Sequence, residues 1–314
     1  MENSETILGK IEPDITQRFV TRREAILKGA AVSSTVAAGL AMMSAPIALA
    51  ALSREAFGQA APSSVQGVIN FALMLEIFEY EFYSAVLGTS SVSAQNTAFA
   101  AVRAKVPAAA LPAIQQIQKH EQEHVAFLKA NGAVNTLNLT AASFDFTGAR
   151  GAGNGPFAQA TTDLAFLLLT AQGAEDTGVR AYKGQAPNLQ SNPAVLEAAL
   201  RIHSVEARHA SKIRRLRRAT GATKVKFSGT ITGGGAAAAG ADNIPSPPAG
   251  AVTALGLIYA GEDNVTQGGV DVTTLPNLPG GIDVKAVATE AFDEPLTAAQ
   301  VVAIVQPFFI PALS

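Results

Sequence analysis

Two short patterns that combine a glutamate with a second polar residue each occur twice in the sequence. In the first, a tyrosine follows seven residues after the glutamate, at Glu76 with Tyr83 and at Glu175 with Tyr182. In the second, a histidine follows three residues after the glutamate, at Glu121 with His124 and at Glu206 with His209. Residues three or seven apart lie on one face of an α-helix, so both members of a pair can point the same way. The patterns alternate along the chain, which indicates an internal repeat of two helical hairpins.

These residue types suggest metal binding. Four glutamates directed into an apolar bundle would repel one another and lose their hydration unless cations neutralised them. Two divalent ions with four glutamates and two histidines as ligands would remove that cost. The chain contains no cysteine, so any metal must be held by nitrogen and oxygen. Such a ligand set suits iron or manganese better than copper.

The segment HEQEH, residues 120–124, also matches the H-E-x-x-H pattern of zinc metalloproteases. In that interpretation both histidines bind zinc, Glu121 is a general base, and a third ligand comes from elsewhere. The next glutamate after Glu123 is Glu175, on another predicted helix, and the repeated pattern stays unexplained. A zinc peptidase is therefore a remote alternative. In the di-metal interpretation we expect His120 to lie beside the site or on the surface without being a ligand, and Glu123 to be solvated.

Four predicted helices carry the repeated patterns. We expect them at Ser63 to Leu87, at Leu111 to Ala130, from Pro156 to a stop at Gly184, and from Asn192-Pro193 to Gly221. One long connection, residues 131–155, separates the second helix from the third, which predicts an all-α four-helix bundle with a crossover over residues 61–221. The arginines near the end of the fourth helix are expected to be solvated: Arg214, Arg215, Arg217 and Arg218.

Together these residues resemble the di-metal carboxylate site of the ferritin-like superfamily, which includes bacterioferritin, rubrerythrin and manganese catalase. The segments NFALMLEIFEYEFYSAVL and AFDEPLTAAQVVAIVQPF are similar to exported ferritin-like domain proteins. The resemblance covers residues 62–218 and is weaker in the tail. It implies six metal ligands: Glu76, Glu121, His124, Glu175, Glu206 and His209.

The resemblance also implies roles for particular side chains. Glu121 and Glu206 would bridge the two ions, and Tyr83 and Tyr182, the candidate catalytic residues, would hydrogen-bond ligand carboxylates across the bundle. The alternative for the tyrosines is simple packing as buried aromatic residues.

Two other glutamates compete with Glu76 as the ligand from the first helix, namely Glu79 and Glu81. The matched spacing to a tyrosine in the third helix favours Glu76, with Glu79 as a neighbour of the site. Gly178 stands one turn after Glu175, where rubrerythrin has an extra metal-binding glutamate. Together with the lack of cysteine, this argues against rubrerythrin-type peroxidase activity.

A site of this kind implies an exported oxidoreductase that acts on hydrogen peroxide or dioxygen, in oxidative-stress defence. With two manganese ions it would be catalase-like, and with two iron ions ferroxidase-like, taking Fe(II) as a small substrate. One alternative is a non-catalytic metal-binding protein with a structural or stress-protection role. A hollow iron-storage shell is disfavoured by the long tail, and a homo-oligomer is left open.

The composition limits the other function classes. The formal net charge is −2 and the sequence pI is about 6.1, so no basic surface is expected for nucleic acid. Hydrophobic residues make up 48% of the chain, enough to fill a sizeable core.

The two ends of the chain differ from the middle. Arg22 and Arg23 precede an uncharged run from Gly29 to Leu52, which resembles a twin-arginine export signal within residues 1–60 and predicts a periplasmic or extracellular protein. An uncleaved membrane anchor is the alternative, and it would be the sole membrane contact. Residues 222–314 are rich in Gly, Ala and Pro, and predict an irregular extension with short strands and a helix at 298–305, with Asp293 and Thr297 as candidate caps.

Overall fold

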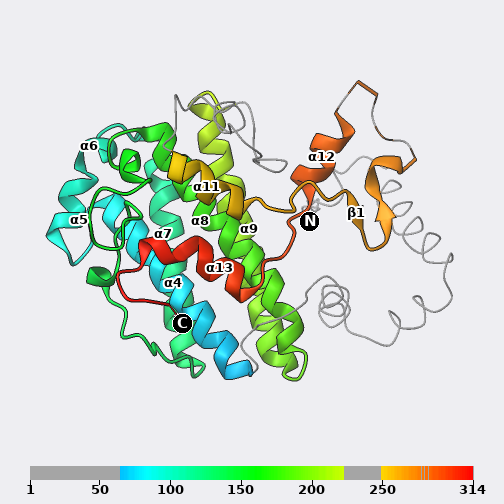
Figure 1. Cartoon of the computed structure of the whole chain (residues 1–314), viewed down its shortest axis with the longest axis horizontal. Helices are drawn as coiled ribbons and strands as arrows, with labels where there is room; N and C mark the ends of the chain where they lie inside the picture. Colours follow the sequence, from blue (N-terminus) through cyan, green and yellow to red (C-terminus); the bar gives the residue numbers. More distant parts are fainter. Residues whose placement is uncertain (1–63, 223–248, 277, 279, 282, 314) are drawn as a thin grey trace, which may run out of the picture. The chain divides into compact units, whose positions relative to one another are not determined.

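The computed structural model describes residues 64–222, 249–276, 278, 280–281 and 283–313. The predicted export signal therefore lies outside the described residues. Four long helices carry the predicted site residues (Figure 1): α4 (Val65–Leu87), α7 (Leu111–Ala130), α8 (Leu164–Gln185) and α9 (Pro193–Ala219). Across the described ranges, no helix has the length and apolar character needed to cross a bilayer.

The four helices form two hairpins, as the sequence predicts. Helix α4 packs mainly on α7, and α8 packs mainly on α9. The short helices α5 (Ser93–Ala98) and α6 (Ala100–Arg103) join α4 to α7, and the 3₁₀ turn η5 (Ala186–Leu189) joins α8 to α9. The connection from α7 to α8 is long and contains the turns η3 (Ala141–Ser143) and η4 (Ala158–Thr161). The predicted bundle with a crossover is confirmed.

The predicted bounds are right for three of these helices and wrong for α8. Asp163 caps the start of α8 by accepting a hydrogen bond from the backbone N–H of Phe166, so the helix begins well after Pro156. At its other end the helix continues through Gly184 to Gln185. Gly184 does not stop the helix. Its missing side chain admits another segment, since a Cβ built there would lie 1.9 Å from the carbonyl oxygen of Leu296.

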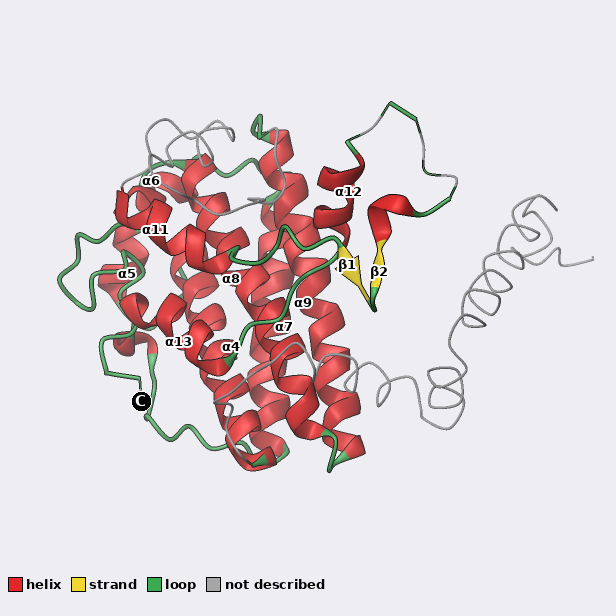
Figure 2. Ribbon diagram, turned by 45° about the vertical axis from the view of Figure 1, so that its right-hand side comes forward, coloured by secondary structure: helices red, strands yellow, loops and turns green. Residues whose placement is uncertain are grey.

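The C-terminal part of the chain contributes helices and a small sheet. The helices are α11 (Ala249–Ile258), α12 (Val284–Ala291) and α13 (Ala298–Val305), followed by the 3₁₀ turn η8 (Gln306–Phe308). Figure 2 shows the two short antiparallel strands β1 (Thr266–Gln267) and β2 (Val270–Asp271), followed by the turn η7 (Val272–Thr274). The predicted helix at 298–305 is confirmed, with Thr297 as its cap, whereas Asp293 does not cap it. The predicted irregular chain was wrong for α11 and α12.

Aromatic packing joins the crossover and the chain end to α4. Phe78 of α4 lies 5.5–6.1 Å, centroid to centroid, from four other phenylalanine rings: Phe144, Phe146, Phe308 and Phe309. Phe144 and Phe309 also form an isolated backbone bridge. Buried aromatic groups contribute large apolar areas, so the last residues of the chain belong to the core of the bundle.

The prediction of solvated arginines holds for Arg215 and Arg218 and is wrong for the other two. Arg217 is fully buried and donates a hydrogen bond to Gln172, while Arg214 forms an ion pair with Asp176. The hydroxyl of Tyr259, just after α11, also donates to Asp176. The C-terminal segment, meaning the described chain from α11 onward, thus covers the side of α8 that carries Asp176. Sequence spacing alone does not indicate this contact.

Arg180 of α8 fastens the same segment to the bundle. Its guanidinium donates to the carbonyl oxygens of Ile258, Ala260 and Glu294, and it lies 3.2 Å from the carboxylate of Glu262. A buried charge is stable only when hydrogen bonds or an opposite charge compensate it. The C-terminal segment supplies this compensation for Arg180, and Arg180 in turn holds the segment on α8.

We expect Gly184→Ala to destabilise the protein by about 1–3 kcal/mol, because the new methyl group would overlap the backbone of Leu296 and displace it from α8. Thermal unfolding followed by circular dichroism measures the change. Gly280→Ala is the matched control, since a Cβ there meets nothing within 4 Å. Equal melting temperatures for the two variants would contradict the assigned close approach.

Candidate metal centre

Six carboxylate and imidazole side chains from all four long helices converge in the bundle. Helices α4 and α8 each supply one glutamate, and α7 and α9 each supply a glutamate and a histidine. They form two overlapping groups whose ligand atoms lie within 4.8 Å of one another: Glu76, Glu121, His124 and Glu206, and Glu121, Glu175, Glu206 and His209. All six side chains are buried. The structure therefore brings together every residue predicted as a ligand.

Each histidine Nδ1 atom is surrounded by carboxylate oxygens. His124 Nδ1 lies 3.0 Å from Glu76 Oε2, 3.1 Å from Glu121 Oε2 and 3.2 Å from Glu206 Oε1. His209 Nδ1 lies 2.7 Å from Glu121 Oε1 and 3.3 Å from Glu175 Oε2. One ring nitrogen offers a single hydrogen or a single lone pair, so it cannot satisfy several carboxylates at once.

The cluster leaves buried polar atoms without hydrogen bonds. Within the described residues these are Glu121 Oε1, Glu175 Oε2, both carboxylate oxygens of Glu206, and His209 Nδ1. The close approach of Glu121 Oε1 to His209 Nδ1 thus lacks hydrogen-bond geometry. Buried polar atoms normally have partners, and divalent cations would provide them for this set of oxygen and nitrogen donors. The residues present therefore fit a divalent metal site.

Two tyrosines hold the outer oxygens of the carboxylates. The hydroxyl of Tyr83 on α4 donates to Oε1 of Glu175 on α8, and the hydroxyl of Tyr182 on α8 donates to Oε1 of Glu76 on α4. The other oxygen of each glutamate faces a histidine. The tyrosines thus orient one carboxylate each across the two hairpins, as predicted, and their role in catalysis stays a prediction.

Glu79 lies beside the cluster and in neither group. A Cβ built at Gly178 would lie 3.1 Å from Glu79 Oε1 and 3.2 Å from Glu206 Oε2, so the glycine leaves room for both carboxylates. Burial, then the charges of Glu206 and other neighbouring glutamates, raise the pKa of Glu79 well above its ordinary value. Glu81 is half-buried and outside both groups. The choice of Glu76 over these two agrees with the geometry.

His120 is placed behind His209, away from the carboxylates. Its Nδ1 lies 2.9 Å from His209 Nε2, and the two rings stack with centroids 5.1 Å apart. Gln116 contacts the other nitrogen of His120 at 2.7 Å. A zinc site on HEQEH would need His120 and His124 on one ion, whereas only His124 belongs to a ligand group. The sequence allows His120 a place beside the site, but its spacing does not indicate that the partner is His209 on another helix.

The remaining polar residues near the motifs have ordinary structural partners. Glu123 is exposed, as predicted, and pairs with Lys119 at 3.6 Å. His203, one turn before Glu206, lies with its Nδ1 3.1 Å from the carbonyl oxygen of Val179. Neither residue contributes to the cluster.

The cluster retains protons when no cation is bound. Burial raises the pKa of Glu121 to about 7, although the two nearby histidines oppose this rise. Burial alone would lower the pKa of the two histidines, but the carboxylates around them raise it to about 12 for His124 and about 11 for His209. A metal ion must displace these protons, which makes its binding depend on pH.

The stability of the metal-free protein should therefore fall as pH rises above about 4.5, the ordinary pKa of Glu121. A group whose pKa is raised on folding stabilises the folded state fully below its unfolded-state pKa and loses this contribution as pH rises through its folded-state pKa. For Glu121 that window extends to about 7, and for the histidines it opens at 6.5 and extends beyond pH 8.

Melting temperatures of the metal-free and Mn(II)-loaded proteins, measured between about pH 5 and 8, check this expectation. The difference between the loaded and free proteins should widen as pH rises. A difference that stays constant or narrows would show that the cluster does not carry these protons.

The comparisons with known proteins agree with this arrangement. A ferritin-like domain model matches residues 64–219, which span α4, α7, α8 and α9. No curated protein and no solved structure matches the chain. The matched region coincides with the bundle and contains all six residues of the cluster. The chain therefore contains a ferritin-like domain over residues 64–219.

Proposed function

We propose that this protein binds two divalent iron or manganese ions and is an oxidoreductase that acts on hydrogen peroxide or dioxygen. The observation that carries the proposal is the overlap of the two groups of candidate ligands. Each group contains four residues, and both contain Glu121 and Glu206. Two carboxylates shared between two adjacent sites are suited to bridge a pair of ions.

Charge balance supports two ions. The four glutamates of the cluster carry four negative charges when ionised, and two divalent cations carry four positive charges. A neutral assembly can remain in an apolar bundle at low cost, whereas a single divalent ion would leave two negative charges uncompensated. The two histidines then bind as neutral imidazoles.

When bound, such a pair of ions can exchange two electrons with peroxide or dioxygen. Disproportionation of two hydrogen peroxide molecules to two water molecules and one dioxygen molecule needs no external reductant. In the oxidation of Fe(II), the substrate itself supplies the electrons, so that reaction needs no separate reductant either. These two reactions are favoured, because the chain has no cysteine with which to hold an iron–sulfur electron donor.

The protein's own groups would position and isolate the site. Tyr83 and Tyr182 fix the outer oxygens of Glu175 and Glu76, which keeps the inner oxygens in place for the ions. His120 contacts the outer nitrogen of His209 and so fixes the orientation of that ring. The surrounding core excludes bulk water, which strengthens electrostatic interactions at the site.

Glu121→Gln should reduce the metal content from about two ions per chain to fewer than one, because a shared ligand loses its charge while its shape is kept. Elemental analysis of the purified protein measures this, and Glu123→Gln on the exposed face of α7 is the matched control. Peroxide decay and oxygen consumption are recorded on the same samples. Rapid peroxide decay with Mn indicates the catalase-like reaction, and oxygen uptake on adding Fe(II) indicates the ferroxidase-like one.

Tyr83→Phe and Tyr182→Phe should retain the metal while slowing turnover by about 10- to 100-fold, since each removes a hydrogen bond that orients a ligand carboxylate. Metal-loaded wild-type protein without either activity would reject the enzyme and leave the alternative of a metal-stabilised structural protein. One zinc ion per chain would instead favour the peptidase interpretation.

Export by the twin-arginine route is part of the proposal and rests on Arg22 and Arg23 ahead of the uncharged run from Gly29 to Leu52. Replacing both arginines with lysine should hold the protein in the cytoplasm, because that route recognises the arginine pair. Immunoblots of periplasmic and cytoplasmic fractions measure the distribution. Arg18→Lys is the control, and normal export of the double variant would exclude this route.

A further inference from the structure

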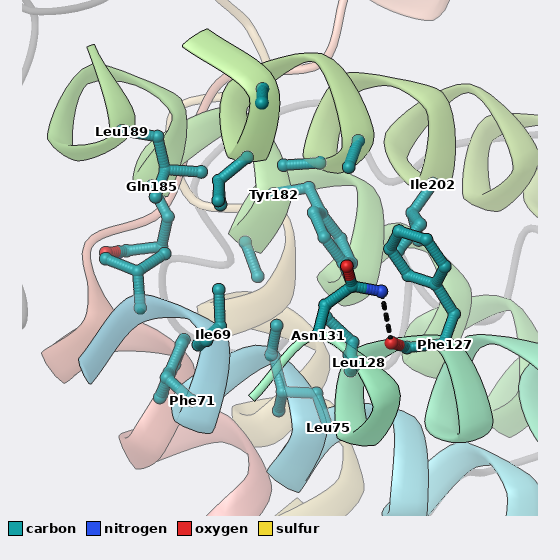
Figure 3. A pocket seen from close by; sticks show the side chains of 17 residues that line it. Ile69, Phe71, Leu75, Phe127, Leu128, Asn131, Tyr182, Gln185, Leu189 and Ile202 are labelled. Atoms are coloured by element: carbon teal, nitrogen blue, oxygen red, sulfur yellow. Dashed lines mark hydrogen bonds between the residues drawn. The ribbon is translucent and has the colours of Figure 1, made fainter. Parts of the chain in front are cut away.

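An apolar cavity of about 180 Å³ lies at one end of the bundle. The proposed reaction does not use this cavity. It is lined by the first turns of α4 and α9 and the last turns of α7 and α8. Figure 3 shows Tyr182, Phe127 and Ile202 among the side chains that line it. Phe127 is 43% exposed, so an aromatic side chain is accessible where the cavity meets solvent.

The lining selects against charged molecules. All its described residues are apolar except Tyr182, Asn131 and Gln185, and none carries a charge. An ion entering the cavity would lose hydration without gaining a partner of opposite charge. Apolar cavities of about 150 Å³ hold a benzene molecule, so this cavity can take a benzene-sized ring with a small substituent.

Gln185 adds one polar requirement. Its side chain is only 4% exposed and lines the cavity. The amide Oε1 accepts a hydrogen bond from Asn188, but Nε2 has no hydrogen-bond partner within the described residues. A buried amide N–H without a partner costs free energy, and an acceptor atom on a ligand would recover it.

We infer that this cavity is a binding site for a small, neutral, mainly apolar molecule that carries one hydrogen-bond acceptor, such as an aryl ketone. The ring packs among the apolar side chains, including the ring of Tyr182, and the acceptor receives a hydrogen bond from Gln185 Nε2. The hydroxyl of Tyr182 donates to Glu76. The bound molecule therefore lies one side chain away from the candidate metal centre.

Two probes of nearly equal shape test the inference on the full-length, metal-loaded protein. Acetophenone carries a carbonyl oxygen, and α-methylstyrene has a methylene group in its place. Dissociation constants from ligand-detected NMR titrations should show both probes binding, with acetophenone about fivefold tighter because of its one additional hydrogen bond. Gln185→Leu should remove this preference and leave the affinity for α-methylstyrene nearly unchanged.

A second variant tests the location without altering Gln185. Ala198 of α9 lines the cavity, and Ala198→Leu should fill it and weaken both probes at least tenfold. Ala126→Leu, on the exposed face of α7, is the matched control and should bind both probes as wild type does. Circular dichroism and metal content of each variant show that the fold is retained.

Three results would overturn the inference. Neither probe binding the wild-type protein would mean that the cavity is closed to such ligands, for example by another part of the chain. Binding that survives Ala198→Leu would place the probes elsewhere. Equal affinities for both probes would show that Gln185 does not donate a hydrogen bond to the ligand.

Discussion

Four carboxylates with no exposed surface face one another inside the bundle, and their mutual repulsion is the constraint that the surrounding structure has to meet. Ionised carboxylates in an apolar interior need opposite charge or hydrogen-bond donors close by. Two histidines and two tyrosines supply part of this compensation from within the bundle. The carboxylate oxygens that still lack partners define where divalent cations fit. The symmetry of the arrangement follows from the repeat, since each hairpin contributes two glutamates, one tyrosine and one histidine.

The same constraint recurs on the other side of α8. Adjacent residues on a helix point about 100° apart, so Glu175 faces the cluster while Asp176 faces the C-terminal segment. Asp176 is buried and is compensated there by Arg214 and Tyr259. Arg180, one turn further along, binds three carbonyl oxygens of the same segment. Helix α8 is consequently buried along most of its length, and the C-terminal segment is needed to satisfy its charged groups.

Tyr182 links two parts of the bundle that differ in chemistry. Its hydroxyl belongs to the polar cluster, and its ring belongs to the apolar cavity at the end of the four helices. A change in the packing of the ring would alter the hydrogen bond to Glu76, because both depend on the position of one rigid side chain. The equivalent residue of the other hairpin, Tyr83, is enclosed by Phe82 and neighbouring core residues and does not line this cavity.

The sequence by itself determined the helical bundle, the crossover and the six residues that converge, because helical periodicity fixes which side chains share a face. It also distinguished Glu76 from Glu79, through the spacing to tyrosine that recurs in the second hairpin. Only the tertiary structure decided which residues meet across helices. It placed His120 behind His209, paired Arg217 with Gln172 and Arg214 with Asp176 of α8, and turned Gly184 from a helix stop into a point of close contact. These contacts join residues far apart along the chain, and no local spacing rule specifies them. The physical reason is that local sequence sets the direction of a side chain on its own helix, whereas its partner depends on how the helices and the C-terminal segment pack.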